Sequence, residues 1–221
     1  MKIIRTIAIC LLMISCTTTE LVDYWKNPDI DSYSPEKVLI VGMTSNLEAR
    51  QKFEKQLQLE YATRGIESVQ SIEYFEPSFT NDKKSDEDLK ALESTLIKDG
   101  FDTILLTKVI GVEDIIEYKE GYNDYDDTYK KFREDFLKYQ DVYYNPDYYK
   151  EYTVYHTETT MYCICPTKDR ELIWQGYIDI TDPQSVNETL NDYVRLIVVV
   201  LEELQLINPI VFNDNINEEA L

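Results

Sequence analysis

Apolar and amphipathic stretches alternate along the first half of the chain. Residues 37–42 form a short apolar run, which is typical of a strand buried on both faces. Ser45 and Glu48 then match a capping box, the signature of a helix start. Apolar side chains follow at roughly helical spacing, at Leu47, Phe53, Leu57 and Tyr61. Gly65 suits the left-handed residue that ends a helix, so the pattern predicts a helix up to this point and a second strand over residues 66–75.

A second helix and a third strand follow in the same way. Ser85 and Asp88 match another capping box, and Gly100 suits a helix end. Between them lies an apolar stripe of Leu89, Leu92 and Leu96. Residues 103–109 are again mostly apolar and predict a strand. Strand, helix, strand, helix and strand at this spacing predict right-handed βαβ units with parallel strands.

The C-terminal part predicts a hairpin and a last helix. Residues 151–165 and 171–180 alternate well enough for two strands, and the short turn between them makes the pair antiparallel. Ser185 and Glu188 match a third capping box. The helix that follows has an apolar stripe of Val186, Leu190, Val194, Ile197, Leu201 and Leu204. We therefore predict one α/β domain over residues 37–212, in which a parallel βαβαβ part, an antiparallel β-hairpin and a C-terminal helix share one mixed sheet.

The N-terminus has the features of an export signal. Lys2 and Arg5 supply positive charge, and residues 7–14 are apolar but too short to span a bilayer. A small residue precedes Cys16, and the segment that ends there resembles the bacterial lipobox. That resemblance implies a signal peptide over residues 1–15 and lipidation of the Cys16 thiol. The alternatives are an ordinary secretory signal and a buried N-terminal strand.

Two further segments are expected to lie outside the domain. Residues 16–36 are polar, contain two prolines and lack periodicity, so they predict a lipidated tether. Residues 213–221 are acidic and predict a loose tail.

Residues 112–150 break the rhythm of the domain with a segment rich in Tyr and Asp. A connection of this length is usually functional, disordered or an elaboration. Tyrosine offers a large contact area with a polar tip, which suits an interface or stacking on sugar rings. The interaction candidates are Tyr122, Tyr125, Tyr129, Tyr143, Tyr144, Tyr148 and Tyr149. The alternative, that these rings cover the domain's own sheet edge, is equally open.

A cluster of oxygen ligands in the same segment makes calcium the metal to consider. The candidate ligands are Asn123, Asp124, Asp126 and Asp127. Hard cations prefer oxygen ligands, but no EF-hand register fits this stretch. A solvated acidic loop is the favoured interpretation.

Composition narrows the range of partners. The chain has 221 residues, 43% of them hydrophobic, which is enough for a core. Its formal net charge of -20 opposes binding to phosphate backbones, so we expect no nucleic-acid partner. The same charge opposes unaided contact with anionic lipids, so the membrane partner is expected through the lipid anchor.

Few residues of the predicted domain suit catalysis. Residues 42–46 could receive an anion at a helix start, but a single glycine is not a phosphate-binding fingerprint. His156 and Cys163 would lie on opposite faces of one strand, about 23 Å apart by rise, which excludes a nucleophile–base pair. His156 is therefore interpreted as a strand-surface residue. The sequence predicts no catalytic residue and no cofactor.

Cys163 and Cys165 are the thiols left once Cys10 and Cys16 are assigned to the signal and the anchor. At positions i and i+2 of a strand their Cα atoms would lie about 6.5 Å apart on one face. This is near the outer limit of disulfide geometry. Two core thiols are the favoured interpretation, with a disulfide or half of a metal site as the alternatives.

A family resemblance becomes specific in the hairpin region. Residues 158–162, 171–176 and 182–186, together with 38–42 and 100–108, look like a group of uncharacterised bacterial envelope lipoproteins. These have a lipobox, a small α/β domain and a Tyr-rich insertion. The resemblance implies a small α/β fold and no established activity.

These observations predict a lipid-anchored protein of the bacterial cell envelope, attached to the outer membrane and facing the periplasm. We expect it to bind or scaffold rather than catalyse, with the Tyr-rich insertion contacting an envelope protein or a glycan. The alternatives are a glycan hydrolase that uses two carboxylates and a purely structural lipoprotein.

Overall fold

The computed structural model describes residues 18–80, 83–117, 150–165 and 171–210. Its strands are β1 (Thr19–Lys26), β2 (Lys37–Met43), β3 (Glu67–Gln70), β4 (Thr103–Glu117), β5 (Lys150–Cys163) and β6 (Leu172–Thr181). Its helices are α2 (Leu47–Thr63), α3 (Ser71–Tyr74), the 3-10 helix η1 (Pro77–Thr80), α4 (Asp86–Lys98) and α6 (Val186–Glu203).

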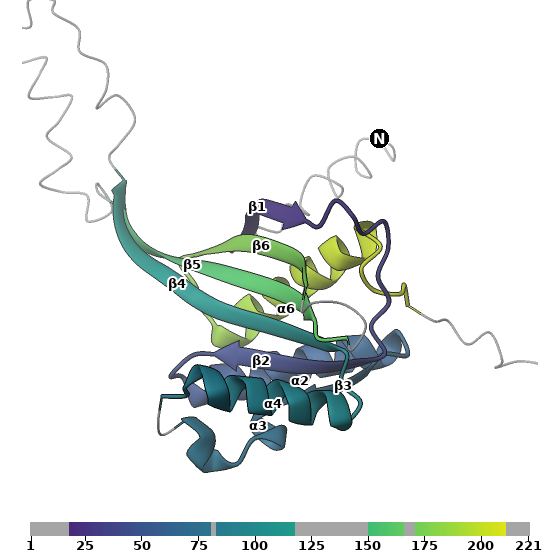
Figure 1. Ribbon diagram of the computed structural model, residues 1–221. Helices are drawn as coiled ribbons and strands as arrows, with labels where there is room; N and C mark the ends of the chain where they lie inside the picture. The colour runs from purple at the N-terminus through teal and green to yellow at the C-terminus, as the bar shows by residue number, and fades with distance from the viewer. Residues whose placement is uncertain (1–17, 81–82, 118–149, 166–170, 211–221) are drawn as a thin grey trace, which may run out of the picture.

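The strands form one six-stranded mixed sheet in the order β1-β6-β5-β4-β2-β3 (Figure 1). β2 lies parallel to β3 and β4, as expected for consecutive βαβ units. β5 pairs antiparallel with β4 and with β6, and β1 adds an antiparallel edge. The predicted fold, a parallel βαβαβ part joined to an antiparallel hairpin and a C-terminal helix on one mixed sheet, is therefore confirmed.

Helices cover the two faces of the sheet unequally. α2 and α6 pack on one face, and α4 lies on the opposite face, over the parallel strands (Figure 1). Val38 and Ile40 enter the core with α2 and α6, whereas Leu39 points into the smaller core with α4. Because β2 is covered on both faces, its sequence is continuously apolar instead of alternating.

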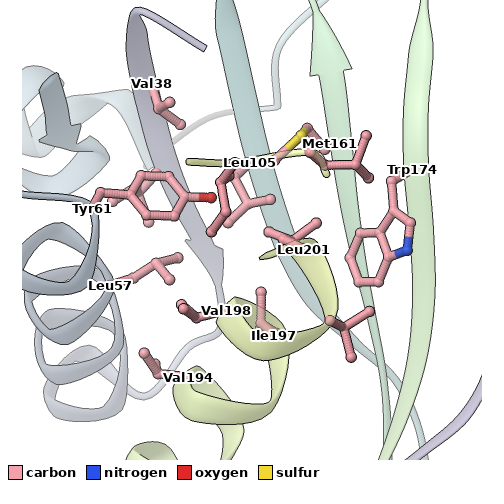
Figure 2. Close-up of a cluster of buried hydrophobic side chains, with 14 of the residues drawn as sticks. Val38, Leu57, Tyr61, Leu105, Met161, Trp174, Val194, Ile197, Val198 and Leu201 are labelled. Carbon is pink, nitrogen blue, oxygen red and sulfur yellow. The ribbon is translucent and has the colours of Figure 1, made fainter. Parts of the chain in front are cut away.

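The larger core joins the sheet to α2 and α6 (Figure 2). Its side chains include Val38, Leu57, Tyr61, Leu105, Met161, Trp174, Ile197 and Leu201. Each large aliphatic side chain buried here contributes about 1.5–3 kcal/mol relative to its exposed state. Val194, Ile197 and Leu201 of the stripe predicted on the last helix are buried against the sheet, whereas Val186 at its start is exposed.

The helix ends follow the sequence signals in part. Ser85 and Asp88 form the predicted capping box. α2 is instead capped by Asn46, whose Oδ1 accepts a hydrogen bond from the Ala49 N–H at 3.0 Å, one residue later than the predicted Ser45. Ser185 precedes α6 without a side-chain cap bond. An amide oxygen at the N-cap accepts the same bond as a hydroxyl, so the capping-box motif alone did not locate the cap of α2.

The segment predicted as a lipidated tether, residues 16–36, contains β1, and this part of the prediction is wrong. Thr19–Lys26 pairs antiparallel with β6. Most side chains of β1 are exposed because it is an edge strand, so no alternating pattern marks it in the sequence. Backbone hydrogen bonds hold this strand where side-chain periodicity gives no signal.

Two other boundaries differ from the predictions. The predicted strand over residues 66–75 is only four residues long, because the chain turns into α3 at Ser71. The insertion predicted over residues 112–150 begins and ends within strands, since β4 runs to Glu117 and β5 starts at Lys150. Residues 118–149 lie outside the described residues.

The indole ring of Trp174 packs directly against Gly176. Trp174 is fully buried, and a Cβ added at Gly176 would clash with Cζ2 and Cη2 of its ring. We expect Gly176→Ala to lower the free energy of unfolding by about 1–3 kcal/mol, because the indole has no room to move within the core. Urea unfolding measures this change.

Gly111→Ala is the matched control for this prediction. A Cβ there would meet its nearest neighbour, Cδ2 of His156, at an ordinary 3.5 Å. Equal unfolding midpoints for the two alanine variants would contradict the proposed close packing of Trp174 on Gly176.

Candidate functional site

The β4–β5 hairpin extends beyond the rest of the sheet. β2 pairs with β4 only from Thr103 to Lys108 by register, whereas β5 pairs with β4 as far as Glu117. β6 joins β5 only from Val154 onward. We define the arm as residues 109–117 of β4 with residues 150–157 of β5. From the Lys108–Glu158 pair to the Glu117–Lys150 pair it spans about 30 Å.

A β-bulge lies at the base of the arm. The register shifts between Val109 and Gly111, directly after the last residue that pairs with β2. A bulge adds one residue to a strand and increases its local bend and twist. Figure 1 shows the two strands curving away from the helical layers at this end.

The β4 side of the arm exposes apolar side chains. The exposed fractions are 48% for Val109, 50% for Ile110, 58% for Val112 and 52% for Ile116. A single exposed apolar residue is ordinary, but here four lie within eight positions of one strand. The arm therefore offers an apolar surface close to the point where the chain enters residues 118–149.

A cluster of charged side chains lies beside the bulge. His156 Nδ1 is 2.7 Å from Asp179 Oδ1, and its Nε2 is 3.6 Å from Glu113 Oε2. The hydrogen bond to Asp179 is the main cause that raises the pKa of His156 above its ordinary value, and Glu113 adds to it. One row nearer the core, Lys108 forms an ion pair with Glu158 at 2.7 Å. These side chains tie β4, β5 and β6 together at the base of the arm.

The position of His156 matches its sequence interpretation as a strand-surface residue. Its side chain is 35% exposed, whereas Cys163 is buried in the larger core. Both residues lie on the continuous strand β5, seven positions apart, as the predicted separation requires.

Cys163 and Cys165 are joined by a disulfide, with their Cα atoms 5.3 Å apart. The favoured interpretation as two core thiols is therefore wrong. It assumed one continuous strand, but β5 ends at Cys163 and the chain turns. This turn brings the two Cα atoms closer than the strand spacing of about 6.5 Å.

A hollow of about 860 Å³ lies between α4 and the sheet, at the carboxyl end of β2. Its apolar lining includes Leu39, Val41, Leu89, Leu92, Leu96, Ile104 and Leu106. Lys83 and Lys84, from the segment before α4, also line it. The carboxyl ends of parallel strands commonly bind ligands, and this lining suits an apolar one.

The lining of the hollow does not suit a carboxylate-based hydrolase. Glu93 is the one carboxylate among the described residues that line it. Glycoside hydrolases of the usual kind need two carboxyl groups flanking the scissile bond. The hollow therefore gives no support to that alternative.

Glu54 forms a buried network at the same end of β2. Its side chain is fully buried, and Oε1 accepts hydrogen bonds from the Gly42 N–H at 2.9 Å, Arg50 Nε at 3.0 Å and Ser71 Oγ at 2.6 Å. Oε2 accepts from the Ile72 N–H at 3.0 Å. The carboxylate thus connects β2, α2 and α3, and its full set of donors offsets the cost of burying a charge.

This network bears on the phosphate interpretation of residues 42–46. The Gly42 N–H donates to the chain's own carboxylate, so it is not available to an external anion. Asn46 caps α2 through its side chain. The geometry supports the alternative interpretation of this segment, a capped helix start.

Several predicted site residues lie outside the described residues. They are the lipidation candidate Cys16, the interaction tyrosines between residues 122 and 149, and the calcium candidates Asn123, Asp124, Asp126 and Asp127. Within the described ranges, no group of three or more His, Cys, Asp or Glu side chains could hold a metal ion. No helix in those ranges is both long and apolar enough to cross a bilayer.

The sequence did not predict the arm or the buried network. The apolar side chains within residues 109–116 were the available signal for the arm, because they continue the mostly apolar sequence of the predicted strand past residue 109. Glu54 gave no comparable signal, since it lies among other charged residues of an amphipathic helix.

The geometry defines a mixed α/β domain with helices on both faces of the sheet and an arm formed by the ends of β4 and β5. Its sequence matches no protein-family model and no curated protein. Among solved structures it is similar to a PelC dodecamer from Paraburkholderia phytofirmans, with a TM-score of 0.43 and 11% identity over 85% of this chain and 98% of that one.

A second similar structure is lipoprotein GNA1162 from Neisseria meningitidis. The TM-score is 0.41 and the identity 12%, over 76% of this chain and 99% of that one. Similarity at these values establishes neither a shared fold nor a shared function. Any function proposed for this chain has to rest on its own residues.

Glu54→Gln is expected to destabilise the domain by about 3 kcal/mol or more. The substitution removes one partner of a buried ion pair and points an amide N–H₂ group toward hydrogen-bond donors. Urea unfolding measures the loss. Glu48→Gln, at an exposed i, i+4 pair with Lys52, is the control and should leave the unfolding midpoint unchanged. Equal midpoints for both variants would contradict the role assigned to Glu54.

The single histidine of the chain makes its titration directly measurable by NMR. We expect a midpoint above the ordinary value of 6.5, and a fall toward that value in Asp179→Asn. Because the folded-state pKa is raised, the stabilisation by His156 is fully present below the unfolded pKa and is lost as pH rises through the folded pKa. The destabilisation caused by His156→Gln should therefore be larger at pH 6 than at pH 9. An unshifted midpoint would contradict the charged cluster.

Proposed function

We propose that the protein is a lipid-anchored component of the bacterial cell envelope whose α/β domain is a non-catalytic binding module. Cys16 is the proposed attachment point, on the outer membrane and facing the periplasm. The partner is an envelope protein or a glycan, bound through the Tyr-rich insertion.

The observation that carries this proposal is the arm. A short turn would suffice to join two antiparallel strands, because the Glu117–Lys150 pair lies directly opposite in register. The chain instead inserts residues 118–149 between these two strands, whose Glu117–Lys150 pair lies about 30 Å beyond the last row that β2 shares. A strand pair that carries both ends of a Tyr-rich segment beyond the end of β2 is a suitable arrangement for contact with a partner.

The N-terminal features support the anchor. A charged start, a short apolar run and a small residue precede Cys16 in the order that export and lipidation require. Several acyl chains on one cysteine would hold the protein firmly, since each buried methylene contributes about 0.8 kcal/mol. β1 begins at Thr19, so only a short link would separate the sheet from the membrane surface.

Metabolic labelling with a palmitate analogue tests the anchor. We expect the wild-type protein to become labelled and the Cys16→Ala variant to remain unlabelled. Cys10→Ala is the matched control and should label normally, because Cys10 lies within the predicted signal peptide. Label on the Cys16→Ala protein would refute attachment at this residue.

Cross-linking in intact cells tests the insertion. The variant replaces residues 118–149 by Asn-Gly, a pair that closes two-residue hairpins between opposed strands. We expect it to fold with the wild-type unfolding midpoint and to lose the cross-linked partner. Removal of residues 213–221 is the control deletion and should retain the partner. An identical cross-linking pattern in both deletions would count against the insertion as the binding element.

A further inference from the structure

Within the described residues, the arm has an unpaired backbone edge on the β4 side. In an antiparallel pair, alternate residues direct their N–H and C=O groups away from the partner strand. From Val109 onward, β4 has only β5 as a partner within the described chain, because the pairing with β2 ends at Lys108. Residues 109–116 therefore present a row of free donors and acceptors with the spacing of a β-strand.

This edge has only part of the usual protection against strand addition. Natural edge strands are commonly blocked by charged side chains, by proline, by β-bulges or by short length, and this edge has two carboxylates and a bulge at its base. Residues 109–116 contain neither lysine nor proline, and their exposed apolar side chains include Val109, Ile110, Val112 and Ile116. The bulge interrupts only the base of the edge. Such a surface suits an extended segment that adds one strand to the sheet.

The charges along the edge indicate which segment fits. Glu113 and Asp114 are both exposed, and within the described residues Glu113 contacts His156 and Asp114 accepts a hydrogen bond from Thr153. A second copy of the chain would bring these acidic side chains against each other, and each copy has a formal net charge of -20. Like charges placed opposite one another destabilise a strand pair, so a basic segment is favoured over self-association.

We propose that residues 109–116 of β4 form a strand-addition site for an extended peptide segment in which apolar residues alternate with Lys or Arg. This inference deepens the proposed function, because it gives the chemistry of a protein partner bound at the arm. Backbone hydrogen bonds supply the pairing. Val112 and Ile116 meet the apolar side chains on one face of the sheet, and Glu113 meets the basic side chains on the opposite face.

A synthetic peptide of alternating Lys and Val, labelled with fluorescein, tests the site on the full-length mature protein in detergent. We expect saturable binding, measured by fluorescence anisotropy. N-methylation of alternate peptide residues removes the donors that a strand pair needs, and should weaken binding by about tenfold or more. Equal affinity for the N-methylated peptide would overturn strand addition, because it would show binding by charge alone.

Matched lysine variants locate the site on the protein. Val112→Lys places a blocking residue on the edge and should weaken binding by about tenfold or more. Leu59→Lys adds the same charge at a helix position with similar exposure, 55% against 58%, and should bind like the wild type. Equal loss in both variants would overturn the assignment. The His156 resonance, shifted as in the wild type, verifies that the arm base is intact in each variant.

The Asn-Gly variant lacking residues 118–149 separates this inference from the proposed function. Unchanged peptide affinity in that variant supports an edge that is open in the intact protein. A gain in affinity would overturn the proposal, because it would show that the chain's own insertion covers the edge. Failure of the peptide to bind, together with cross-linking that still depends on residues 118–149, would remove the edge site and leave the proposed function standing.

Discussion

The structure depends on the two different pairings that β4 makes. Its first residues lie parallel to β2. The connection that contains α4 therefore crosses one face of the sheet from β3 to β4, which completes the βαβ half of the sheet. The whole strand also lies antiparallel to β5, which connects that half to β6, β1 and α6. Since β2 is much shorter than β4, the same strand that unites the sheet continues beyond it as an arm. β4 therefore contributes both to the core and to the candidate binding surface.

Two clusters of hydrogen bonds and ion pairs connect the elements around β2 and around the base of the arm. The Glu54 carboxylate connects β2, α2 and α3, so the parallel half closes around a buried charge with a full set of donors. The His156 cluster joins β4, β5 and β6 where the bulge bends the arm. The apolar hollow lies at the carboxyl end of β2, and the arm begins where β4 passes that end. A stable domain can thus carry both a concave apolar site and an exposed strand edge.

The sequence predicted the parts of the fold that side-chain periodicity controls. The apolar run of β2, the stripe of α6 and the Ser85 capping box all act locally, and each gave the correct element. β1 was missed because an edge strand held by backbone hydrogen bonds needs no alternating side chains. The length of β4 was missed because its apolar continuation past residue 109 does not by itself indicate a partner strand, and the pairing with β5 forms over a long sequence separation. The sequence predicted the Tyr-rich insertion as a binding element but not the edge of β4. Whether a strand edge is paired depends on how the strands assemble into the sheet.

The central claim is that β4 leaves the body of the sheet with one edge paired to β5 and the other edge free. Amide hydrogen exchange followed residue by residue by NMR tests this most directly. The account predicts that protection alternates along residues 109–116, slow at amides that face β5 and fast at the amides between them. Uniform protection along this stretch would contradict a free edge, and uniformly fast exchange would contradict the arm itself.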